Sequence, residues 1–323
     1  MTKRPIFFFA LKLLVSGLLL WLVLAKLDVA SIQMRLSAAD WRWSTAAVAI
    51  SPCAVLLAAW RWRVLSLGLL SRGESIRYTW IGLFFGSIVP GAVGGDVAKG
   101  VSLAAQRTTA RDVRLPMSII VDKLVGFWVL LLLFLVVAPV VLGTHPNLVA
   151  GLRATIWATG LATVVGLFAG LAIALPRGST WAAGVASRIP VAFLRRVAER
   201  VLGAIAVYRG HGPALRRAVA ICILIHAVNA FALWLVLRSL AIPANGLFAA
   251  TFYFSLSVLV SLPISISGVG VRDVLAATLF TAFGLNPESG VAFSWLLLGL
   301  NLPNALVGGA IQLWEIFRRP PAG

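Results

Sequence analysis

The sequence predicts an all-α polytopic membrane protein with about six full spans and two further apolar segments broken by Pro and Gly. Of its 323 residues, 60% are apolar and only 12% are charged, whereas a soluble domain usually carries about 25% charged residues. The mean hydropathy is +0.98. Apolar stretches near the roughly 20 residues that cross a bilayer recur along the chain. We therefore expect a single transmembrane domain over residues 1–323 and no soluble domain.

The predicted full spans share a long apolar run with few charges. They are Ile6–Ala25, Ser44–Ala59, Ser118–Leu142, Ala154–Leu175, Ala218–Leu237 and Val291–Trp314. The first resembles a signal peptide, but no small-residue cleavage site follows it, which favours an uncleaved helix. Cys53 and Cys222 both lie in apolar segments. We interpret them as small core residues rather than a disulfide or a metal site.

Lys and Arg are distributed unevenly between alternate loops. The segments that would share a side with the N-terminus hold 19 of the 28 basic residues, and the alternate segments hold five. Those 19 lie at residues 3–4, 61–77, 107–114, 177–217 and 318–319. Because cytoplasmic loops are rich in Lys and Arg, we expect a multi-pass protein of the cytoplasmic membrane with both termini in the cytoplasm. The net charge of +18 lies beside spans, which predicts contact with anionic headgroups and no nucleic-acid binding.

Residues 176–217 form the longest predicted cytoplasmic loop, and Ile189–Arg209 within it has helical periodicity. Apolar residues recur from Val191 onward, and charged residues such as Arg195 and Glu199 fall between them. Two interpretations stay open. The segment is either an amphipathic helix on the inner leaflet or a short helix packed on its neighbours.

Two apolar regions, Thr79–Leu103 and Leu247–Phe283, are interrupted by Pro and Gly. Aligning Pro90 with Pro263 brings small residues, and then charges of both signs, into register. The first region would leave and return to the cytoplasmic side, and the second would leave and return to the outside. Inverted repeats with interrupted helices indicate a transporter whose site lies near the bilayer midplane.

The residues that follow each break form the predicted anion site. Pro and Gly interrupt a helix, and the next half-helix presents free N–H groups that favour an anion. A phosphate or carboxylate between the hairpins would also meet two cations, and ions within a membrane are costly and usually functional. The predicted headgroup or anion site comprises Gly94, Gly95, Asp96, Lys99, Ser267, Gly268, Gly270, Arg272 and Asp273. Asp96 and Asp273 would serve as helix caps, cation partners or proton carriers, and these roles stay open.

Further polar residues are weaker candidates for a supporting role. Asp122 and Lys123 open a span, either as an interfacial pair or as part of the site. His226 and Asn229 lie one turn apart and either line a cavity or, more simply, hydrogen-bond neighbouring helices. The same two interpretations apply to Asn301.

These motifs give the chain a family resemblance over almost its whole length. They are Pro90 with Gly94-Gly95-Asp96 and Lys99, Asp122-Lys123, and Ser267-Gly268-Val269-Gly270-Val271-Arg272-Asp273. In their order and spacing the chain resembles the flippase-like membrane family typified by the transmembrane region of lysylphosphatidylglycerol synthase. Relatives often have Arg at position 99, Glu-Arg at 122–123 and Glu at 273, so these departures keep the charge. The resemblance implies a lipid-handling protein, in some relatives linked to moving aminoacylated or glycosylated lipids between leaflets.

The resemblance does not imply the synthase reaction, which belongs to a separate soluble domain. We expect no enzyme, no metal and no cofactor, because the three histidines lack metal-ligand spacing and no phosphate-binding Gly-x-x-x-x-Gly-Lys loop occurs. The leading hypothesis is a translocator or binder of an anionic or phosphate-bearing lipid or glycolipid. The alternatives are an ion-coupled transporter of a small solute and a non-transporting membrane subunit that partners a separate lipid-modifying enzyme. The sequence does not set the oligomeric state.

Overall fold

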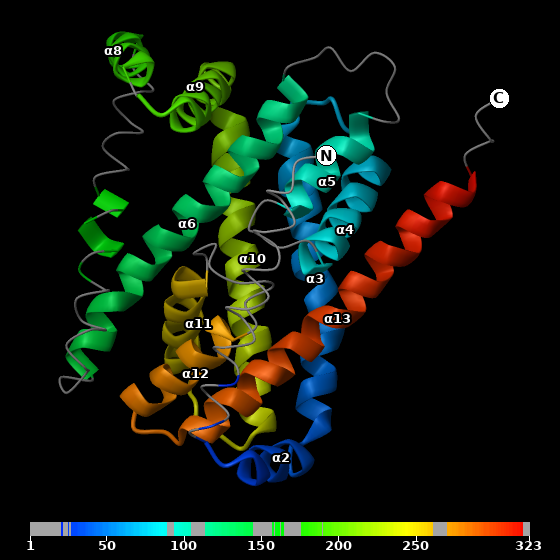
Figure 1. The fold of residues 1–323 in the computed structure, drawn as a ribbon, viewed down its shortest axis with the longest axis vertical. Coiled ribbons are helices and arrows are strands. Elements are labelled where there is room, and N and C mark those ends of the chain that lie inside the picture. Colours follow the sequence, from blue (N-terminus) through cyan, green and yellow to red (C-terminus); the bar gives the residue numbers. More distant parts are fainter. Residues whose placement is uncertain are drawn as a thin grey trace.

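A computed structural model shows that the chain is an assembly of α-helices (Figure 1). The structure describes residues 21, 25, 27–88, 94–104, 114–144, 157, 159–161, 163–164, 176–188, 190–260 and 270–318.

Four helices of the described residues are long and apolar enough to cross a membrane. They are α3 (Trp41–Leu65), α6 (Arg114–Thr144), α10 (Gly212–Ser239) and α13 (Pro287–Arg318). They confirm four of the predicted spans. Each extends beyond its apolar run, because backbone hydrogen bonding continues into the polar residues at the ends. The other two predicted spans, residues 6–25 and 154–175, lie almost wholly outside the described residues.

Local capping signals explain where the shorter helices begin. Asp28 is the N-cap of α2 (Val29–Ser37), a short helix that hydropathy did not predict. The helix α4 (Arg72–Ile88) begins with a capping box, in which the Ser71 N–H donates to the Glu74 carboxylate at 2.8 Å and the Glu74 N–H donates to the Ser71 hydroxyl at 3.2 Å. Such caps satisfy backbone donors that a helix leaves open.

Helices α3 and α10 form the antiparallel centre of the molecule (Figure 1). At one end the Asp40 N–H donates to the Ser239 carbonyl at 2.8 Å, which ties the start of α3 to the end of α10. Helix α13 packs on α3 through the Asn304 side chain, which donates to the Ser51 hydroxyl at 2.7 Å. These contacts join α3, α10 and α13, against which helices of both interrupted segments pack.

The molecule has one arginine-rich end, formed by the C-terminal ends of α3 and α13, the first turn of α10, and the helices α8 (Pro176–Ser187) and α9 (Ala192–Val207). Helix α2 lies at the opposite end (Figure 1). The structure therefore brings the described residues of the segments predicted to be cytoplasmic, among them 61–77 and 190–217, to one end of the molecule.

The predicted loop 176–217 is more ordered than expected, since it contains α8 as well as the predicted helix α9. Helix α9 packs against α6, and its Ala204 is fully buried. The charged residues Arg195 and Glu199 are exposed. Helix α9 therefore packs on α6 with its charged face exposed, and its position on the inner leaflet stays a prediction.

The two interrupted segments are inverted relative to each other (Figure 1). Helices α4 and α5 (Gly94–Ala104) leave from and return to the arginine-rich end, whereas α11 (Gly246–Val260) and α12 (Val271–Ala282) do so at the opposite end. Helices α5 and α12 have 11 and 12 residues. They are therefore about 17–18 Å long, less than the roughly 30 Å of a bilayer core. The hairpin tips, residues 89–93 and 261–269, lie outside the described residues.

Candidate functional site

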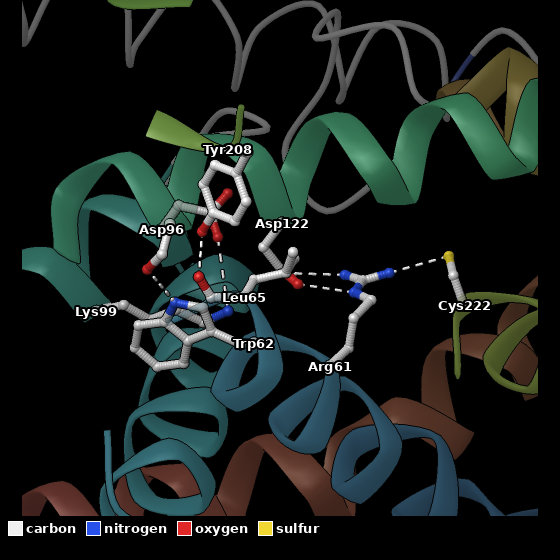
Figure 2. A network of polar contacts seen from close by, with 9 residues as sticks. Arg61, Trp62, Leu65, Asp96, Lys99, Asp122, Tyr208 and Cys222 are labelled. Atoms are coloured by element: carbon white, nitrogen blue, oxygen red, sulfur yellow. Dashed lines mark hydrogen bonds and ion pairs between the residues drawn. The ribbon is translucent and has the colours of Figure 1, made fainter. Parts of the chain in front are cut away.

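Charged side chains from α3, α5 and α6 gather beside the inner hairpin α4–α5 (Figure 2). We call this group the inner polar cluster, and it consists of Arg61, Asp96, Lys99, Asp122 and Lys123. Four of the five belong to the predicted site or its supporting residues.

The best-formed interaction in the inner polar cluster joins Arg61 to Asp122. The Arg61 Nε donates to one carboxylate oxygen at 2.7 Å and its Nη2 donates to the other at 3.1 Å. Both side chains are 11% exposed. The remaining Nη1 donates to the Cys222 sulfur at 3.0 Å (Figure 2). A bidentate pair of this kind is among the stronger charge-assisted contacts in proteins.

Asp122 therefore pairs with Arg61 and not with its sequence neighbour Lys123. Arg61 was missed, because the sequence analysis counted it among the loop residues that set orientation. The available signal was its position between Trp60 and Trp62 inside an apolar helix, where a charge needs a partner.

Asp96 has two cationic neighbours at different distances. The Lys123 Nζ lies 3.0 Å from its carboxylate, and the Lys99 Nζ lies 3.6 Å away. Lys99 also lies over the Trp62 ring, with Nζ 5.2 Å from the centroid. The Trp62 indole N–H is fixed by donating to the Ser118 hydroxyl at 3.0 Å. Asp96 is thus held most closely by Lys123, and Lys99 keeps the looser contact.

The charges of the inner polar cluster do not balance. Three cations face two carboxylates, which gives a formal charge of +1 among the described residues. The Lys99 side chain is only 13% exposed. Lys123 is 59% exposed, so burial penalises chiefly the Lys99 charge, and an anion beside Lys99 would offset that cost.

The inner polar cluster borders an apolar surface. Val97 and Val101 on α5 are 56% and 62% exposed. Phe127, one helical turn beyond Lys123 on α6, is 44% exposed. Charged side chains therefore lie beside exposed apolar side chains, an arrangement that suits an amphiphilic ligand.

Glycines allow the two arms of the inner hairpin to approach closely. A Cβ at Gly95 would lie 2.3 Å from the Gly82 carbonyl oxygen, and a Cβ at Gly82 would lie 2.7 Å from Cε of Lys99. The structure thus gives Gly95 a packing role. A headgroup contact by Gly95 or by Gly94, the first residue of α5, stays a prediction.

A separate outer polar cluster lies at the second hairpin, α11–α12, which we call the outer hairpin. It consists of Gly270, Arg272 and Asp273, together with Ser294 of α13. The Arg272 Nε donates to the Ser294 hydroxyl at 2.9 Å, and that hydroxyl donates to the Asp273 carboxylate. The Gly270 N–H donates to the other Asp273 oxygen at 2.9 Å. Arg272 is 8% exposed and Asp273 is 1% exposed. One cation and one carboxylate balance, so this cluster is formally neutral.

The contacts of Gly270 correct one expectation. Its N–H already binds Asp273, so this amide is not free for an anion. Of the three roles left open for Asp273, the structure shows capping of α12. Gly270 has a φ of +80°, a backbone conformation that favours glycine. Ser294 was missed because a lone serine in an apolar helix carries no signal in the sequence.

The structure places Lys99 and Arg272 in different clusters and on hairpins that enter from opposite ends. Ser267 and Gly268 lie outside the described residues. Convergence of the two cations on one anion therefore stays a prediction.

The remaining supporting candidates are divided. The His226 Nδ1 lies 2.8 Å from the Tyr253 hydroxyl, which links α10 to α11, and Asn229 contacts the same hydroxyl. This supports hydrogen bonding between helices. Asn301 is exposed and its Nδ2 donates to the Leu297 carbonyl of its own helix at 3.0 Å. Asn301 thus joins neither cluster.

A family model described as Lysylphosphatidylglycerol synthase TM region matches residues 9–308 of this chain. No curated protein and no solved structure matches the chain. The matched residues include both hairpins and both polar clusters.

Proposed function

Because the chain belongs to the family of lysylphosphatidylglycerol synthase transmembrane regions, we propose that it is a lipid translocator that takes a phosphate-bearing lipid by its headgroup at the inner polar cluster. The family relates the chain to lipid modification or transport. Movement of a lipid between leaflets, without covalent chemistry, is the specific activity proposed here.

The observation that carries this proposal is the excess positive charge of the inner polar cluster. Lys99 is the cation with the looser pairing, since its Nζ lies 3.6 Å from Asp96, and its side chain on α5 is only 13% exposed. A phosphate placed beside Lys99 would neutralise the cluster. Charge-assisted hydrogen bonds of this type are stronger than neutral ones, above all away from water.

The exposed apolar surface beside the inner polar cluster suits the acyl chains of a lipid. Val97, Val101 and Phe127 would lie against acyl chains while the headgroup meets Lys99 and Lys123. We therefore place the lipid entrance between α5 and α6.

The inverted hairpins support movement rather than binding alone. Elements that enter from opposite ends can open a site alternately to either side by rocking of one part against the other. By the excess of Lys and Arg, the arginine-rich end is proposed to face the cytoplasm, and the inner polar cluster would then load from the inner leaflet.

The decisive experiment compares Lys99→Ala with Lys99→Arg and with Arg188→Ala, which removes an exposed charge just after the end of α8. Each protein is reconstituted into vesicles with a fluorescent anionic phospholipid, and the fraction reached by an impermeant quencher is followed with time. We expect Lys99→Ala to slow movement at least about tenfold. Lys99→Arg and Arg188→Ala should keep most of the wild-type rate.

The outcomes separate the alternatives. Retention of lipid without movement would favour a non-transporting subunit. Wild-type rates in a folded Lys99→Ala protein would refute the headgroup site. Movement of a soluble anion, with no lipid movement, would favour the small-solute transporter.

A further inference from the structure

A cavity of about 450 Å³ lies at the arginine-rich end, where the end of α3 meets the corner between α9 and α10. The residues that line it include Arg63, Gly68, Gly210, His211, Pro213 and Arg217. None of its lining residues is Asp or Glu, and it shares no residue with either polar cluster.

The charge in this cavity is not compensated. Arg63 is half-buried and Arg217 is exposed. Neither guanidinium has a hydrogen-bond or ion-pair partner among the described residues. Arginine keeps its charge at any working pH. The inner polar cluster has two carboxylates for three cations, whereas this cavity has no carboxylate for its two arginines.

Two of the residues that line the cavity are glycines with open space at the position of a side chain. Gly68 and Gly210 have φ angles of +87° and +85°. A Cβ built on either would meet no atom within 4 Å. The N-cap of α10, His211, makes no side-chain capping bond to that helix. The partial positive charge at the start of α10 therefore adds to that of the two arginines.

A hydrogen bond and buried apolar packing join the helix ends that form the cavity. The Tyr208 hydroxyl donates to the Leu65 carbonyl, which ties the α9–α10 corner to the end of α3 (Figure 2). Burial raises the pKa of Tyr208, so it remains a donor at neutral pH. Ala204 of α9 and Ala218 of α10 are fully buried and pack in one hydrophobic cluster with Leu65 and Tyr208. The helix ends that carry Arg63 and Arg217 are thus joined by a hydrogen bond and by buried packing.

We propose that this cavity binds a phosphate monoester, held between Arg63 and Arg217. The doubly charged group matches two arginines, and the planar guanidinium fits phosphate oxygens in pairs. The volume falls within the roughly 300–1,000 Å³ of small-ligand sites. The phosphate belongs either to a lipid headgroup or to a soluble molecule. This site is separate from lipid uptake at Lys99, so its failure would leave the proposed function intact.

The test uses the full chain in phosphatidylcholine nanodiscs at constant ionic strength. In one arm, inorganic phosphate is titrated and the heat of binding is measured. In the other arm, nanodiscs contain phosphatidic acid, and the lipid retained by the protein is counted by native mass spectrometry. Binding in both arms assigns the site to phosphate monoesters in general. Binding in the second arm alone assigns it to a lipid headgroup, and binding in the first arm alone assigns it to soluble phosphates.

The variants are Arg63→Gln, Arg217→Gln and the matched control Arg216→Gln, which removes an exposed neighbouring charge outside the cavity. We expect each of the first two to weaken binding at least about tenfold and the control to leave it unchanged. Arg217 is exposed, so Arg217→Gln should fold and carries the test even if Arg63→Gln fails to purify. Absence of binding in both arms, or an equal loss in Arg216→Gln, would overturn the proposal.

Discussion

The inner hairpin α4–α5 and the outer hairpin α11–α12 share one sequence pattern but differ in their surroundings. The outer hairpin belongs to the core of the molecule. Phe252 of α11 and Phe280 of α12 meet Phe293 of α13, with ring centroids 5.2–5.7 Å apart, and all three side chains are fully buried. Its polar residues hydrogen-bond to one another and to Ser294, and their formal charges sum to zero.

The inner hairpin instead lies against charged side chains and borders lipid-facing surface. Its α5 exposes Val97 and Val101, and Lys99 and Asp96 from the same helix enter a cluster with one excess cation. The two halves of the repeat therefore differ in net charge and in burial. We expect the outer hairpin to support the fold and the inner hairpin to hold the ligand.

The largest expected effect tests the ion pair on which the inner polar cluster is built. Asp122→Ala would leave Arg61 buried without its carboxylate and should lower the free energy of unfolding by about 3–5 kcal/mol. The loss in free energy of unfolding is measured by denaturing the purified protein in detergent. Replacing both partners, as in Arg61→Met/Asp122→Leu, should cost much less. A fully stable Asp122→Ala protein would show that the pair does not hold the inner polar cluster together.

A smaller loss is expected from the aromatic core of the outer hairpin. Phe280→Ala should cost about 2–3 kcal/mol, below the usual value for a soluble core, because unfolded helices in a membrane still lie in hydrocarbon. Val101→Ala on the exposed face of α5 is the control and should be nearly neutral. Equal losses in the two variants would remove the distinction between core and lipid-facing hairpins.

The next effect separates a cap from a binding residue. Asp273→Ala would leave the Gly270 N–H and the Ser294 hydroxyl without their acceptor, at a cost of about 1–3 kcal/mol. Lipid movement per folded molecule should stay unchanged, in contrast to Lys99→Ala. Asp273→Asn should keep most of the stability, since Asn retains an acceptor. Lipid movement lost in a stable Asp273→Asn protein would assign the outer hairpin a direct role in transport.

The smallest effect concerns a cap outside both hairpins. The Ser31 hydroxyl and the Ala30 N–H donate to Asp28 and hold its pKa below the usual 3.8. A lowered pKa stabilises α2 above pH 3.8, and this contribution is lost as the pH falls through the folded-state pKa. The protection of α2 amides against hydrogen exchange, measured relative to the unfolded-chain rate at the same pH, should therefore fall below pH 3.8. Asp28→Asn should remove that pH dependence, and an unchanged profile would exclude Asp28 as its source.

Hydropathy and charge patterning alone determined the helical membrane fold, because a bilayer permits few alternatives to apolar helices of fixed length. The Pro and Gly interruptions likewise placed both hairpins, and Lys99, Asp96, Arg272 and Asp273 were all found in polar clusters. Hydrophobic periodicity and residue composition are local properties of a segment, so they can be determined from the sequence alone.

The partners of those charges were decided only by tertiary structure. Arg61 and Asp122 are far apart in the sequence, and the packing of α3 against α6 brings them to 2.7 Å. Ser294 became the link between Arg272 and Asp273 only because α13 crosses α12. An ion pair or hydrogen bond depends on distances of a few ångströms between helices, and no periodicity along one helix records which neighbour it meets.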